Sequence, residues 1–149
     1  MKAILCSTIS LLAFAGELVA PVNRDSNSLA VNGYDTVAYF ESHQPMKGSP
    51  AFTFHWQGAE WRFASAANRD RFAANPSAYA PQFGGYCAWA VSKNYTANAD
   101  PLAWKIIDGK LYLNYNRDIQ KKWEVDVEKR IEDACKNWPN LHRDKDGAQ

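Results

Sequence analysis

Two glycine-containing turn pairs, each flanked by runs of aromatic and aliphatic residues, constrain the fold of this chain more than any other feature. The central residues of a two-residue hairpin loop adopt positive φ, which glycine tolerates without strain. A pair of this kind between two strand-like runs therefore predicts an antiparallel β-hairpin. The two hairpins are expected over residues 51–63 and 104–114, with their turns at Gln57-Gly58 and Asp108-Gly109.

Helical patterns occupy the segments that follow each hairpin. Ser65 precedes an alanine-rich run that stops before Pro76, as an N-cap residue precedes a helix. Residues 86–93 are expected to form a short helix. Residues 117–138 carry apolar side chains three and four positions apart, which predicts a long C-terminal helix. The expected fold class is therefore α+β, with two β-hairpins packed against two or three helices around one aromatic core.

Two shorter segments carry local signals of their own. Residues 35–40 (DTVAYF) are rich in β-branched and aromatic residues and follow the turn pair Asn32-Gly33, so a short strand or a tight extended segment is expected there. Asp100-Pro101 is expected to break the chain before the second hairpin.

Composition excludes several classes of protein. The chain has 149 residues, enough for one domain, and its 13% aromatic content is too high for a disordered tail or a coiled coil. Seventeen basic and sixteen acidic residues give a net charge of +1. Such a balance offers no electrostatic footprint for nucleic acid, so no nucleic-acid partner is expected.

The first 20 residues have the order of an export signal. Lys2 is followed by an apolar run, and Ala13-Phe14-Ala15 places small residues where signal peptidase cuts, with Ala20 as the later alternative. The apolar run is too short to span a bilayer, which needs about 20 residues. A buried N-terminal helix is the other interpretation. The expected organisation is a signal peptide over 1–15, a tether over 16–30, a domain over 31–140 and a polar tail over 141–149, in a periplasmic or secreted protein without membrane insertion after cleavage.

Three strings of the sequence resemble the YHS-domain family, in particular its exported bacterial branch: NGYDTVAYF, WRFASAANRDRFAANPSAYAPQFGGYCAWAV and DPLAWKIIDGKLYLNYN. The resemblance covers roughly residues 30–140 and implies a small YHS-like domain. Many members of the wider family bind metal through cysteines, but Ala64 and Ala67 stand at the matching positions here. The thiolate cluster of those members therefore does not carry over. Cys87, in GGYCAWA, belongs to the pattern of the exported branch.

Cys87 is the leading candidate for chemistry. At the start of a helix, unsatisfied backbone N–H groups favour a thiolate, and a thiolate binds soft metal ions. We therefore expect a non-enzymatic module that binds a copper or zinc ion through Cys87, with His55 as a second ligand. His43 and Met46 share a loop and are weaker candidates, because nothing in their spacing brings them to Cys87.

Two alternatives remain open. In the first, Cys87 and Cys135 form a disulfide in an oxidising compartment, and the protein is a structural or small apolar ligand-binding module. In the second, Cys87 is the reactive cysteine of a thiol redox enzyme. Most of the six tryptophans are expected to fill the core, although they could also line an apolar site. The candidate ligand-binding residues are Tyr34, Asp35, Tyr86 and Trp89.

Overall fold

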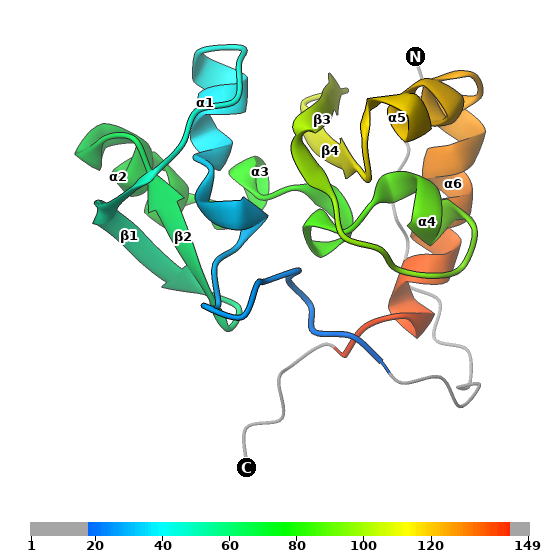
Figure 1. The fold of residues 1–149 in the computed structure, drawn as a ribbon, viewed down its shortest axis with the longest axis horizontal. Helices are drawn as coiled ribbons and strands as arrows, with labels where there is room; N and C mark the ends of the chain where they lie inside the picture. Colours follow the sequence, from blue (N-terminus) through cyan, green and yellow to red (C-terminus); the bar gives the residue numbers. More distant parts are fainter. Residues whose placement is uncertain (1–17, 144–149) are drawn as a thin grey trace.

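The fold was obtained as a computed structural model that describes residues 18–143 (Figure 1). These residues form a mixed α+β structure with short helices and two small antiparallel sheets, which confirms the expected fold class. The predicted signal peptide lies outside the described residues.

Both predicted hairpins are present. The first pairs β1 (Ser49–Trp56) with β2 (Ala59–Phe63), and the second pairs β3 (Asp100–Ile107) with β4 (Lys110–Asn114). Both central residues of each turn have positive φ, as a type I′ turn requires. The φ values are 49° for Gln57, 73° for Gly58, 52° for Asp108 and 73° for Gly109.

The helices between the hairpins begin at polar caps or at proline. Ser65 caps α2 (Ala66–Ala74), because its Oγ accepts a hydrogen bond from the backbone N–H of Asn68 at 3.1 Å. Pro76 then begins α3 (Pro76–Tyr79), where its missing N–H costs nothing. The predicted helix over 86–93 is the shorter α4 (Ala88–Ser92), with Cys87 at its N-cap position.

Two local predictions are wrong. Residues 35–40 are not a strand, because Asp35 caps α1 (Thr36–Glu41) by accepting hydrogen bonds from the two backbone N–H groups that follow Thr36. The N-cap outweighs the β propensity of this segment. Asp100-Pro101 does not break the chain but begins β3, where a register shift between Asp100 and Trp104 accommodates the proline.

The predicted C-terminal helix is two helices, α5 (Arg117–Glu124) and α6 (Val127–Asn137), followed by a 3-10 turn over 138–140. The apolar positions of this segment recur mostly at four-residue steps, and each such step rotates the stripe by about 40° on a straight helix. The break resets this rotation, so that Trp123 and Ile131 both face the interior.

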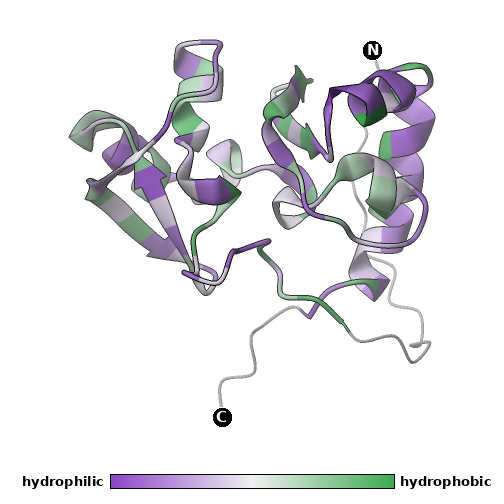
Figure 2. Ribbon diagram, viewed as in Figure 1, coloured by the Kyte–Doolittle hydropathy of each residue, from purple (hydrophilic) through white to green (hydrophobic). Residues whose placement is uncertain are grey.

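The interior consists of two aromatic clusters rather than one core. The first gathers around Trp61, Phe63 and Phe72, and the second around Tyr112 and Trp123. In Figure 1, α1, α2, β1 and β2 form one half of the molecule, and β3, β4, α4, α5 and α6 form the other. Strand β4 contributes to both clusters, because alternate side chains of a strand point to opposite faces. In Figure 2, hydrophobic (green) stretches of the β3–β4 hairpin lie beside α5 and α6, whose ribbons are mostly hydrophilic (purple).

The N-terminal part of the described chain is packed and is not the expected tether. Val22 is 2% exposed and belongs to the first cluster. Val19 is hydrogen-bonded through its backbone N–H to Leu141 O and through its carbonyl to Arg143 N, both at 3.0 Å. Residues 18–30 and 141–143 therefore belong to the domain. Within residues 18–143, no helix has the length and apolarity needed to cross a bilayer.

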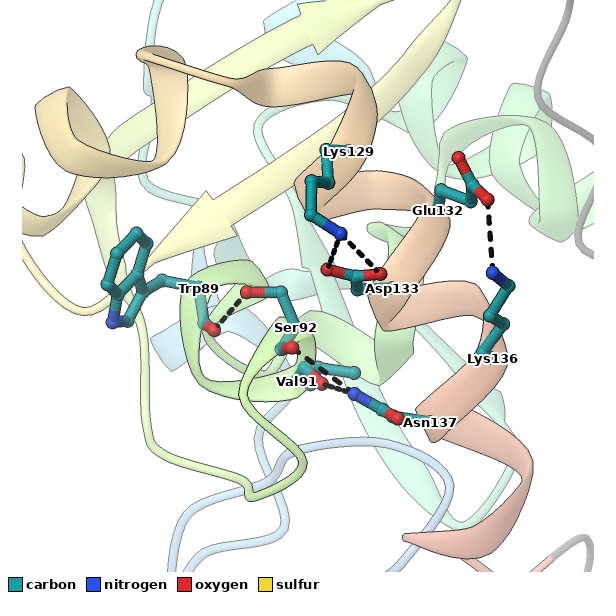
Figure 3. A network of polar contacts seen from close by, with 8 residues as sticks. All are labelled: Trp89, Val91, Ser92, Lys129, Glu132, Asp133, Lys136 and Asn137. Carbon is teal, nitrogen blue, oxygen red and sulfur yellow. Dashed lines mark hydrogen bonds and ion pairs between the residues drawn. The ribbon is translucent and has the colours of Figure 1, made fainter.

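The contact between α4 and α6 closes the second half (Figure 3). Asn137 Nδ2 donates hydrogen bonds to Val91 O at 2.9 Å and to Ser92 O at 3.2 Å, which satisfies carbonyls at the C-terminal end of α4. Two exposed ion pairs lie along the outside of α6, between Lys129 and Asp133 and between Lys136 and Glu132. Pairs of this kind add only a few tenths of a kcal/mol each.

Candidate functional site

Cys87 is a buried, neutral thiol. It is 1% exposed, and its Sγ accepts a hydrogen bond from the backbone N–H of Tyr115 at 3.2 Å and donates to Asn114 Oδ1 at 3.7 Å. Burial raises the pKa of Cys87 above its ordinary value, and hydrogen bonds from nearby backbone N–H groups offset this only in part. The structure thus reverses the expectation that the helix start would favour a thiolate.

Cys87 also forms no disulfide with Cys135. It is a free cysteine, so the disulfide between Cys87 and Cys135 is not formed. Cys135 lies on α6 and faces the second cluster. If the protein is a structural or small-ligand module, it is therefore not stabilised by a Cys87–Cys135 disulfide.

His55 is far less enclosed than Cys87 and has a different partner. Its side chain is 77% exposed on β1, with Nε2 at 4.0 Å from Glu60 Oε1 across the first hairpin. The described part of the chain contains no cluster of three or more His, Cys, Asp or Glu side chains that could hold a metal ion. His43 lies in an exposed loop before β1. The metal ligands expected from the sequence are therefore not grouped around Cys87.

Asp35 is a structural residue that connects three segments of the fold, not a residue of a ligand pocket. Its fully buried carboxyl accepts four hydrogen bonds that join α1, the end of β2 and α2. Asp35 is therefore the N-cap of α1 and not part of a ligand site with the other candidate residues. The four donors are Val37 N at 2.9 Å, Ala38 N at 3.1 Å, Ala64 N at 2.8 Å and Asn68 Nδ2 at 2.8 Å.

The other three candidate ligand residues lie apart from one another. Tyr34 packs on the first cluster. Tyr86 faces the second, where its hydroxyl donates a hydrogen bond to Ala20 O at 3.1 Å. Trp89 carries two cations against its ring, with Lys93 Nζ at 4.9 Å and Arg130 Cζ at 4.6 Å from the ring centroid. The structure does not bring these residues together with Asp35 in one site.

Three of the six tryptophans do line a common cavity. This tryptophan cavity has a volume of about 230 Å³ and lies where the first cluster meets the second. Most of its lining residues are apolar, but polar atoms make up the larger part of its exposed wall. Cavities at such junctions are typical ligand sites. Its lining residues are Pro21, Val22, Trp56, Gln57, Trp61, Ala80, Pro81, Gly84, Trp138 and His142.

The rings around the tryptophan cavity are held in place by contacts of their own. His142 stacks on Trp138 with a centroid distance of 4.0 Å and an interplanar angle of 13°, and its Nδ1 lies 2.7 Å from Trp138 O. On the opposite cluster, Trp61 Nε1 donates a hydrogen bond to Trp56 O at 3.0 Å. These contacts form a wall of fixed flat surfaces before any ligand enters, which lowers the entropic cost of binding.

Gly84 allows the backbone to approach closely at this cavity. Its φ is +63°, and a Cβ atom there would collide with the carbonyl of Pro21. The backbone N–H of Asn23 donates to Gly84 O at 2.8 Å, which holds the N-terminal segment against the cavity. Sequence reasoning assigned the tryptophans mostly to the core and His142 to the polar tail. No local pattern links these residues, because they come from both ends and the middle of the chain.

Neither protein-family models nor curated proteins nor solved structures give a match when compared with this chain. Membership of the YHS-domain family stays a prediction from the residues quoted above.

Proposed function

We propose that this protein is a non-enzymatic binding module that holds a small, flat ligand with both apolar and polar groups in the tryptophan cavity. The observation that carries the proposal is the enclosure of about 230 Å³ by Trp56, Trp61 and Trp138, with His142 stacked on the last of them. Flat indole faces favour planar ligands, and Gln57 and His142 offer polar atoms that could orient one.

The lining of the tryptophan cavity supports binding rather than catalysis. Among the lining residues within 18–143, His142 is the one ionisable side chain, and no thiol, hydroxyl or carboxylate accompanies it. Nucleophilic and general acid–base mechanisms both need a second positioned group. The proposed function is therefore that of a small-ligand-binding module without a Cys87–Cys135 disulfide.

Metal binding through Cys87 is the rival proposal and has less support. A metal ion needs a deprotonated thiolate and further ligands, whereas Cys87 is protonated, buried and hydrogen-bonded to Asn114 and Tyr115. His55 points to solvent on the other hairpin. Cys87 here has the surroundings of a packed core residue.

Export of the chain is a separate proposal, and ligand binding in the tryptophan cavity does not depend on it. We infer that the chain is secreted or periplasmic because of the order of its first 20 residues. The N-terminal sequence of the protein purified from its own cells tests this inference. A mature chain beginning near residue 16 is expected, and a chain retaining Lys2 would refute export by cleavage.

Ligand binding is tested with indole and quinoline as probes, followed by chemical-shift changes of the Trp side-chain N–H groups in 15N-labelled protein. Saturable shifts are expected at Trp56 and Trp61 for wild type and about tenfold weaker binding for Trp138→Leu. Trp89→Leu is the matched control, because Trp89 packs on the same cluster as Trp138 without lining the cavity. Equal effects of the two substitutions, or no saturable shift, would refute the site.

The metal rival is tested in the same samples. Copper(I) is titrated against a competing chelator with wild type and with Cys87→Ser. We expect no difference between the two proteins. Stoichiometric uptake that Cys87→Ser abolishes would favour the metal module instead.

A further inference from the structure

A second surface, separate from the tryptophan cavity, runs between β3 and α5. These two elements pack together in the second half of the molecule (Figure 1). The space between them has a volume of about 440 Å³ and shares no lining residue with the tryptophan cavity. We call it the basic groove, and its lining residues are Leu102, Trp104, Lys105, Arg117, Gln120, Lys121 and Glu124.

The basic groove carries two cations that no carboxylate neutralises. Lys105 Nζ lies 3.9 Å from Glu124 Oε1, so these two charges offset each other. Arg117 and Lys121 form no ion pair with any residue between 18 and 143. They are four residues apart on α5 and so lie on the same helix face, where like charges repel. An anionic group placed between them would relieve that repulsion.

Apolar side chains lie beside these cations. Leu102 is 43% exposed although it is a large aliphatic residue in a strand. The Trp104 ring is half-buried and rests on Tyr39, with 5.2 Å between ring centroids. The basic groove therefore joins an apolar floor to a positive wall, and a ligand that fills it needs both kinds of group.

The backbone of β3 also faces the basic groove. In the register of the second hairpin, Ile107 and Lys110 flank the two-residue turn, so Trp104 is at a position whose backbone groups point away from β4. Its carbonyl accordingly accepts a hydrogen bond from Gln120 Nε2 of α5 at 2.9 Å rather than from the paired strand. No third strand covers this edge within the described residues. Where Gln120 does not already occupy it, a strand edge without a paired strand is a template for an extended chain.

We propose that the basic groove binds an extended acidic peptide segment of a partner protein. Carboxylates of the segment pair with Arg117 and Lys121, and an apolar side chain between them packs on Leu102 and Trp104. The alternation of charged and apolar residues follows from the period of two in an extended chain. This inference does not depend on the ligand of the tryptophan cavity.

The test uses a fluorescein-labelled peptide of alternating Glu and Val, six residues long, in a fluorescence anisotropy titration at low salt. Wild type is compared with Lys121→Glu and with the matched control Lys122→Glu, which makes the same charge change on α5 outside the basic groove. About tenfold weaker binding is expected for Lys121→Glu, and at most about twofold weaker for Lys122→Glu. Thermal unfolding of each variant checks that all three proteins are equally folded.

Several results would overturn the proposal. Equal losses for the two lysine variants would mean that the peptide senses only the overall charge of α5. If a peptide of alternating Lys and Val bound equally well, the negative charge of the ligand would not matter and the proposal would be wrong. If the Glu-Val peptide did not bind, the basic groove would not be a peptide site. Competition by free glutamate as effective as that of the unlabelled peptide would show a site for small anions instead of an extended chain.

Discussion

Replacing Asp35 with alanine is expected to be among the most damaging single changes in this domain. The carboxyl is fully buried and accepts hydrogen bonds from four donors on three separate segments. The substitution removes the cap of α1 and also leaves Ala64 N and Asn68 Nδ2 without their acceptor. Both donors are partly buried.

The cost can be estimated from these contacts. Loss of an N-cap costs about 1 kcal/mol, and each of the two donors left without a partner costs about 1–2 kcal/mol, the lower part of the range for buried groups, because both are only partly buried. The free energy of unfolding should therefore fall by about 3–5 kcal/mol, a large fraction of the roughly 5–15 kcal/mol typical of a domain. The midpoint of thermal unfolding should fall by about 10–20 °C.

Urea denaturation of the described domain, followed by circular dichroism, measures this change at constant m value. Asp25→Ala is the matched control, because Asp25 Oδ1 also accepts two backbone hydrogen bonds, from Asn27 N at 2.8 Å and Leu29 N at 3.0 Å, but at an exposed site. A loss for Asp35→Ala no larger than for Asp25→Ala would refute the reasoning. Asp35→Asn should fall between wild type and alanine, because it keeps one acceptor and presents an amide N–H to the second pair of donors.

Three further predictions follow from individual contacts. Gly84→Ala should dislodge the segment at Pro21 and weaken indole binding, since its Cβ has no room beside that carbonyl; unchanged affinity and stability would contradict this. Tyr39→Phe should cost about 1–3 kcal/mol in urea unfolding, because the hydroxyl donates a buried 2.7 Å hydrogen bond to Pro101 O. Burial raises the pKa of Cys87 above its ordinary value of 9.0, so the folded state favours the neutral thiol. This contribution to the free energy of unfolding is fully present below pH 9.0 and is lost as the pH rises towards the pKa of the folded state. Between about pH 8 and pH 10, wild type should lose more unfolding free energy than Cys87→Ala, and parallel pH profiles would show that the thiol plays no part.

Features set by neighbouring residues were predictable from the sequence. A two-residue turn with glycine at its second position encodes both hairpins, and the hydroxyl of Ser65 encodes the start of α2. In each case the signal and the structure it specifies lie within a few residues. Residues 35–40 show the limit of such reasoning, because β propensity and an N-cap gave opposite signals and the cap prevailed through additional long-range bonds to Asp35.

The candidate site was less predictable because its parts are distant in sequence. Nothing near Trp56 indicates that it shares a cavity with Trp138 and His142, since that proximity arises only when the two clusters meet. The chemistry of Cys87 was also inferred from its place at a helix start. Burial outweighed that local effect on its pKa.

The pairing of Val19 with Leu141 and Arg143 bears on how this protein is made. Synthesis proceeds from the N-terminus, so Val19 leaves the ribosome long before its two partners exist. Either hairpin can form while the chain is still growing, and residues 20–30 meet their partners at Glu60, Gly84 and Tyr86 early, but Val19 has to remain unpaired until nearly the whole domain has been translated. The closing step of folding thus waits for the synthesis of residues 141–143. A growing chain in this state lacks the wall of the tryptophan cavity that Trp138 and His142 form, and any chaperone that meets it encounters Val19 unprotected.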